Sequence, residues 1–160
     1  MIIQTKMGGM FLKNKAERAN ECFNSGFNCA QSVLSVFCED YGLDKSYALK
    51  IACSFGGGMG HLGEVCGAVS GAFMVLGLIY GQSTENDMQK KALTYSKVKD
   101  FAQRFMEING TINCTKLLNY DLSDEEQLNA AKQAGIFKVK CPKYIKDAVA
   151  ILEEMIAEQP

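Results

Sequence analysis

The sequence predicts an all-α protein, a compact bundle of about six or seven helices with a buried central helix. Three observations support this prediction. The 160 residues include only two prolines, Pro142 and Pro160, so few positions interrupt a helix. Apolar residues recur at spacings of three and four along most of the chain. No segment shows the alternation of β-branched residues, bounded by hairpin turns, that predicts a sheet.

The chain length suits a single domain, and we expect residues 13–160 to form it, preceded by a flexible lead-in at 1–12. Hydrophobic residues make up 48% and charged residues 22%, as in ordinary globular proteins. The formal net charge is -1, and the basic residues are interspersed with acidic ones. Nucleic acid is therefore not expected as a partner, because phosphate binding needs a concentrated positive face.

The sequence predicts a soluble, cytoplasmic protein without direct membrane insertion. The N-terminus has no apolar stretch of secretory-signal length. The longest uncharged run covers residues 65–84, and its apolar part, 65–80, is slightly short for a membrane span and rich in small residues. A homo-oligomer is compatible with this composition, and the redox partner is unknown.

Cap and stop residues divide the first third of the chain into three helices. The first covers about 13–23. The second follows Asn28, a favoured N-cap residue, and stops at Gly42. Asp44 caps the third. The run Gly56–Gly60 then breaks the chain, and we expect it to be a tight connection.

The segment 65–80 is apolar on all sides, which is typical of a central helix. Gly67 and Gly71 are four residues apart and share one face, so another backbone can approach closely there. Cys66 is expected in the first turn of this helix.

The second half of the chain predicts four further helices. A long helix lies within 84–109 and a short one covers 114–119. Ser123 with Glu126 forms a capping-box pattern before a polar helix. The last helix is expected to begin at Pro142, because proline is favoured at the first helical position. The long helix carries an apolar stripe of Met88, Ala92, Tyr95, Val98, Ala102, Phe105 and Ile108.

Seven cysteines are many for a chain in a reducing compartment, and the odd number argues against a complete disulfide framework. Free thiols, metal ligands and redox thiols are the better interpretations. Three cysteines near predicted helix ends are expected to be small buried hydrophobes, namely Cys22, Cys38 and Cys53. Four others fall at predicted helix beginnings, namely Cys29, Cys66, Cys114 and Cys141.

A helix beginning presents free N–H groups and a partial positive charge, which favour a thiolate and lower its pKa. Four helix beginnings pointing inward would offset the negative charge of four thiolates around one metal centre. The chain has no C-x-x-C spacing, so the fold must bring the four sulfurs together from distant elements.

The sequence resembles the C_GCAxxG_C_C family of redox-active proteins, whose hallmark is a CGAxxG motif. That motif is Cys66-Gly67-Ala68-Val69-Ser70-Gly71 here, and "GFNCAQSVL" and "INCTKLLNYDLS" are also family-like. The resemblance covers about residues 14–156. It implies that the four pattern cysteines are Cys29, Cys66, Cys114 and Cys141.

A related domain occurs in split-Soret cytochromes c together with an iron–sulfur centre. The resemblance therefore implies that these four cysteines bind a metal, as a [2Fe–2S] cluster for electron transfer, with zinc as the alternative. The C-x-x-C-H motif of covalent haem is absent from this chain.

Two further hypotheses need no metal. Cys66 could be the attacking thiolate of a thiol–disulfide redox protein. His61, the single histidine, could act as a general base toward Cys66 in an enzyme, although the sequence favours a structural role in the glycine-rich loop. A phosphate site in that loop is disfavoured, because no Gly-Lys-Ser/Thr ending follows it.

Overall fold

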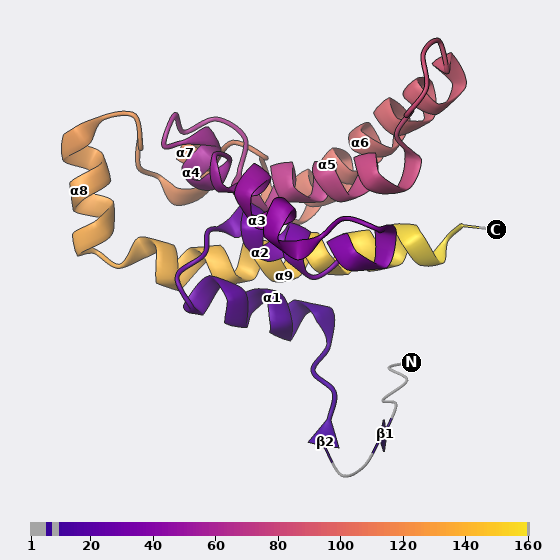
Figure 1. Cartoon of the computed structure of the whole chain (residues 1–160). Helices are drawn as coiled ribbons and strands as arrows, with labels where there is room; N and C mark the ends of the chain where they lie inside the picture. The colour runs from indigo at the N-terminus through magenta and orange to yellow at the C-terminus, as the bar shows by residue number, and fades with distance from the viewer. Residues whose placement is uncertain (1–5, 8–9, 160) are drawn as a thin grey trace.

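The computed structural model describes residues 6–7 and 10–159 and confirms the all-α prediction (Figure 1). Two two-residue strands, β1 (Lys6–Met7) and β2 (Met10–Phe11), pair antiparallel before the first helix. The remaining part of the expected lead-in, residues 1–5 and 8–9, lies outside the described residues. No helix in the described ranges combines the length and apolar character needed to cross a bilayer.

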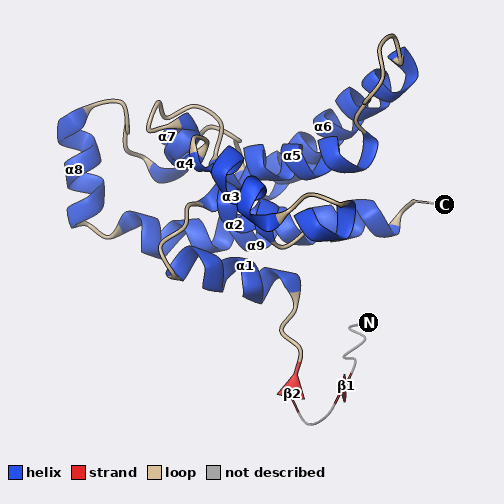
Figure 2. Ribbon diagram, in the orientation of Figure 1, coloured by secondary structure: helices blue, strands red, loops and turns tan. Residues whose placement is uncertain are grey.

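The described chain forms more helices than the six or seven expected, because short turns between the long helices are helical too (Figure 2). In chain order they are α1 (Lys15–Asn24), α2 (Cys29–Ser35), the 3-10 helix η1 (Cys38–Tyr41), α3 (Lys45–Cys53), α4 (Gly56–Met59), α5 (Gly67–Tyr80), α6 (Met88–Asn109), α7 (Cys114–Leu118), α8 (Glu125–Gln133) and α9 (Ile136–Ala157).

The core lies where α2 meets α1, α3, α5 and α9 (Figure 1). All seven residues of α2 are buried. The first half of α5 is buried as well, from Gly67 to Ala72, whereas most of its second half is half-exposed. Burial of these short helices, rather than their intrinsic propensity, stabilises them.

The predicted caps Asn28 and Asp44 stand at the starts of α2 and α3, and side chains cap other helices too. Asn14 and Asn28 each form a complete capping box with a residue three positions on. Asp44 and Asn113 accept backbone N–H groups at the starts of α3 and α7. These contacts fix where the helices begin, because each satisfies an N–H group that has no partner within its helix.

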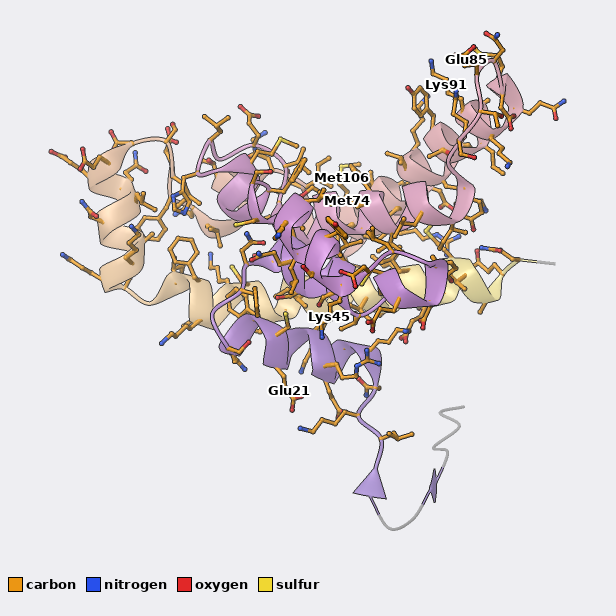
Figure 3. The ribbon with its side chains drawn as sticks, in the orientation of Figure 1. Glu21, Lys45, Met74, Glu85, Lys91 and Met106 are labelled. Carbon is orange, nitrogen blue, oxygen red and sulfur yellow. The ribbon has the colours of Figure 1, made fainter. Side chains whose placement is uncertain are left out.

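The end of α5 and the start of α6 form an arm that extends away from the other helices (Figure 1). Glu85 and Lys91 lie at its far end (Figure 3). The predicted apolar stripe of α6 is therefore only partly buried. Phe105 is in the core, but Met88 and Tyr95 are exposed, because the described helices leave that part of the arm uncovered, and Ile108 near the other end of α6 is exposed as well.

Two predicted helix starts are wrong. The cap of α8 is Asp124 and not Ser123. The Asp124 side chain accepts a hydrogen bond from the backbone amide of Gln127. Helix α9 begins at Ile136 and passes through Pro142. Proline lacks the N–H of a helical hydrogen bond, so its presence inside a helix is costly in isolation. Burial of α9 on both sides of Pro142, at Cys141, Tyr144 and Ile145, offsets that cost.

Candidate four-cysteine site

The four cysteines expected to form one site line a single cavity of about 490 Å³. They come from four separate elements: Cys29 from α2, Cys66 from the start of α5, Cys114 from α7 and Cys141 from α9. All four are at most 8% exposed. The fold therefore gathers sulfurs that are separated by up to 112 positions, from 29 to 141, in the sequence.

Backbone pairing fixes Cys66 beside Cys114. The Cys66 amide donates to the carbonyl of Ile112 at 2.8 Å, and the Cys114 amide donates to the carbonyl of Glu64 at 2.6 Å. Val65 and Asn113 form an antiparallel bridge between these two bonds. This short ladder joins the segment before α5 to the segment before α7, so the two helices start side by side.

Small residues bring the start of α2 against the start of α5, as the CGAxxG spacing predicts. A Cβ at Gly67 would lie 3.1 Å from the Cβ of Cys29, and one at Gly71 would lie 2.7 Å from the carbonyl oxygen of Ala30. Real Cβ atoms do not approach so closely without a shift of the neighbour. The glycines of the motif thus allow Cys29 to reach the cavity.

Cys141 lies inside α9, one residue before Pro142, and is not the helix cap that the sequence predicts. Polar side chains join this part of α9 to α7. The Tyr144 hydroxyl donates to the carbonyl of Leu117 at 3.0 Å, and the Lys140 ammonium donates to the same carbonyl at 3.2 Å. These bonds satisfy free carbonyls at the end of α7 and hold Cys114 near Cys141.

The glycine-rich loop forms another wall of the cavity, with five consecutive residues, 57–61, in the left-handed region. At Gly58 (φ +67°) an added Cβ would lie 2.7 Å from the Cβ of Cys114. At Gly57 it would collide with the imidazole of His61. Met59 and His61 adopt φ near +69° and +66°, which costs about 1–2 kcal/mol for each side-chain-bearing residue. The loop is thus held in a strained form around the cavity.

Burial dominates the electrostatics of the thiols. It raises the pKa of Cys66 to about 12, although the nearby amides of Ala68 and Val69 favour the thiolate. Burial also raises the pKa of Cys114 to about 12. These shifts are opposite to the lowering of the pKa expected at helix starts. The free energy lost by removing a thiolate from water exceeds the stabilisation that the helix starts give it.

Cys29 and Cys141 are neighbouring thiols whose pKa values shift in opposite directions. Interaction with Cys141, followed by burial, raises the pKa of Cys29, and interaction with Cys29 lowers the pKa of Cys141. Cys141 is therefore the most acidic of the four thiols, even though it is the one that does not lie at a helix start.

The remaining cysteines differ from one another. Cys38 is fully buried, as expected of a small hydrophobe, and Cys22 is half-buried. Cys53 is exposed and lines the same cavity as the four pattern cysteines, contrary to the expected burial. The side-chain amide of Asn28 donates to the Cys53 carbonyl at 2.9 Å and thereby holds the end of α3 near the start of α2. No sequence signal indicates this tertiary contact.

The sequence interpretation also missed the non-sulfur wall of the cavity, which includes Lys132, Phe137 and Tyr144. Phe137 and Tyr144 lie four residues before and three residues after Cys141. That spacing places both near the sulfur on one helix face, and it would have identified them once the true start of α9 was known.

Among the residues that the structure describes, no three His, Cys, Asp or Glu side chains are arranged to hold a single metal ion.

Comparisons with known proteins agree with the cysteine pattern. A family model described as "Putative redox-active protein (C_GCAxxG_C_C)" matches residues 27–155. An uncharacterized protein of Archaeoglobus fulgidus is 28% identical over 154 residues, which cover 91% of this chain and 95% of the relative. No solved structure matches the chain.

Proposed function

Because this chain belongs to the C_GCAxxG_C_C family of redox-active proteins, we propose that it binds an iron–sulfur cluster through Cys29, Cys66, Cys114 and Cys141. The observation that carries this proposal is the single cavity lined by these four buried thiols. Four cysteine ligands suit both iron–sulfur clusters and structural zinc.

The pairing of the thiols fits the two irons of a [2Fe–2S] cluster. A [2Fe–2S] cluster needs two ligands for each of two irons. Cys29 and Cys141 are neighbours in the cavity, and the ladder fixes Cys66 beside Cys114, so the cavity offers two pairs.

The donor set also fits the charge of such a group. Cys29 and Cys114 are the first residues of α2 and α7, and Cys66 caps α5. These helix starts direct partial positive charge toward three of the four sulfurs. No Asp or Glu lines the cavity, so its described walls add no further negative charge. When bound, the cluster would accept and release one electron.

The test is anaerobic purification followed by iron, sulfide and zinc analysis. We expect iron and acid-labile sulfide in equal amounts, about two of each per chain, together with visible absorbance. Cys66→Ser should lose both, whereas Cys38→Ser, which changes a cysteine outside the cavity, should retain them. A colourless protein carrying one zinc per chain would overturn the cluster assignment.

A thiol–disulfide redox protein is the second candidate, and the Cys29–Cys141 contact favours it. The Cys141 thiolate would attack one sulfur of a small disulfide and expel its other half as a thiol. Cys29 would then attack the mixed disulfide, which leaves a Cys29–Cys141 disulfide and releases the second thiol. The role expected for Cys66 from the sequence would pass to Cys141, because burial keeps Cys66 protonated.

Exchange with a small disulfide distinguishes the two candidates. The thiol mechanism predicts exchange that Cys141→Ser abolishes and Cys66→Ser preserves. The cluster proposal predicts that the isolated holoprotein exchanges slowly, because its thiolates are already coordinated.

A further inference from the structure

The four sulfurs form only part of the cavity wall. Its volume of about 490 Å³ falls within the ~300–1,000 Å³ typical of small-molecule sites. Three helices and the loop before α2 contribute apolar side chains to it. These side chains are Phe23, Phe27, Leu117, Leu118, Phe137 and Tyr144.

The sulfur-bearing and apolar parts of the wall are continuous. On α9, Phe137 and Cys141 are four residues apart, so they occupy adjacent turns of one face. On α7, Leu118 stands in the same relation to Cys114. A molecule bound against the apolar wall would therefore contact the region of the thiols.

The charge of the lining is one-sided. Its ionisable side chains other than cysteine and tyrosine are Lys132 on α8 and His61 in the glycine-rich loop, and it contains no carboxylate. Lys132 takes part in none of the ion pairs formed within residues 10–159. Lys132 is exposed and lines the cavity, so its ammonium group can pair with an anion bound there.

We propose that this cavity binds a small planar aromatic acid, whose ring packs between Phe27 and Phe137 and whose anionic group pairs with Lys132. Aromatic side chains favour a flat ring through stacked and edge-to-face contacts. The absence of acidic residues from the lining, together with the free ammonium, selects a ligand carrying negative charge. This inference goes beyond the proposed function, because the binding wall exists whether or not the thiols hold a metal.

The experiment uses the full chain, purified anaerobically and reduced, with 2-naphthoate as the probe. Titration calorimetry should show one site with a Kd on the order of 100 µM. Phe137→Ala should weaken binding at least about tenfold through loss of ring contact. Tyr95→Ala, an exposed aromatic on the distant α6 arm, is the matched control and should leave binding unchanged.

The charge contact is tested separately. Lys132→Gln should weaken naphthoate binding about two- to fivefold, as expected for an exposed ion pair. The same substitution should not affect the uncharged 2-naphthamide. Lys138→Gln, an exposed lysine outside the lining, should alter neither affinity.

Three results would overturn the inference: no binding of naphthoate up to about 5 mM, equal affinity for cyclohexanecarboxylate, or unchanged affinity in Phe137→Ala. Phe137→Leu, which keeps an apolar side chain, provides a second test should the alanine variant unfold, and it should also weaken binding. A preparation that contains iron and sulfide but does not bind naphthoate would overturn this inference and leave the proposed function standing. Naphthoate binding by a preparation that takes up no iron would overturn the proposed function alone.

Discussion

Cys66 and Cys114 are joined through crossed backbone bonds: each amide donates to the carbonyl two residues before the other cysteine, at 2.8 and 2.6 Å. The relative position of these two sulfurs is therefore set by main-chain hydrogen bonds and does not depend on a bound metal. Cys29 and Cys141 reach the same cavity differently, through packing of α2 on α5 and of α9 on α7.

Gly58 supports the Cys114 side of the site, and Gly58→Ala should destabilise the protein. Its new Cβ would lie 2.7 Å from both the Cys114 Cβ and the Glu64 amide, at a φ of +67°. Strain and steric overlap together should lower the free energy of unfolding by about 2–4 kcal/mol, measured by urea denaturation.

The matched control for Gly58 is Gly135→Ala. Gly135 has a φ of +64°, but an added Cβ meets nothing within 4 Å. Gly135→Ala should therefore lower the free energy of unfolding only through backbone strain, by about 1 kcal/mol. Equal losses in the two variants would show that contact with Cys114 is unimportant.

The close approach of α2 and α5 predicts that alanine substitutions at two glycines of α5 change the stability of the protein in opposite directions. At Gly71 an added Cβ would lie 2.7 Å from the Ala30 carbonyl oxygen, so Gly71→Ala should cost about 1–3 kcal/mol. At Gly77 it would meet nothing within 4 Å, so Gly77→Ala should stabilise α5 by about 0.5–1 kcal/mol. Urea midpoints of the two variants should move in opposite directions, and a common direction would contradict the packing.

The buried thiols predict loss of stability at alkaline pH in the reduced, metal-free protein. Cys66 and Cys114 ionise near pH 12 when folded, against an ordinary value of 9.0. Below pH 9 both states are protonated and the full stability is present. As the pH rises from 9 toward 12, the unfolded chain loses its protons first, so the free energy of unfolding falls.

Each of these thiols should contribute up to about 1.4 kcal/mol per pH unit in that window. The doubly substituted Cys66→Ser/Cys114→Ser protein should show a shallower slope between pH 9 and 10.5 in urea denaturation. An unchanged slope would mean that the thiols are not desolvated. For the same reason, metal binding at neutral pH should release protons, which calorimetry in buffers of different ionisation enthalpy would detect.

The bond from Tyr144 to the Leu117 carbonyl connects α9 to α7, and Tyr144→Phe removes it while keeping the ring. Lys140 still donates to the same carbonyl, so the cost should be modest, about 0.5–1.5 kcal/mol. A purified cluster should be lost to a chelator faster than in the wild type, because α7 would be less firmly held. Tyr95→Phe, at an exposed position, serves as the control and should leave the rate unchanged.

The sequence by itself determined the features that depend on neighbouring residues in the chain. The caps Asn28 and Asp44 could be predicted because a cap contacts an amide two or three residues away. The close approach at Gly67 and Gly71 followed from their helical spacing. These positions placed Cys29, Cys66 and Cys114 at helix starts.

The tertiary structure decided how those elements meet and what the thiols experience. Packing carries α9 through Pro142, pairs Cys141 with Cys29, and brings the exposed Cys53 to the cavity. It also reverses the expected pKa of Cys66, because desolvation depends on every atom around the sulfur and not on its place in a helix. Such contacts join residues far apart in the chain, and no local pattern encodes them.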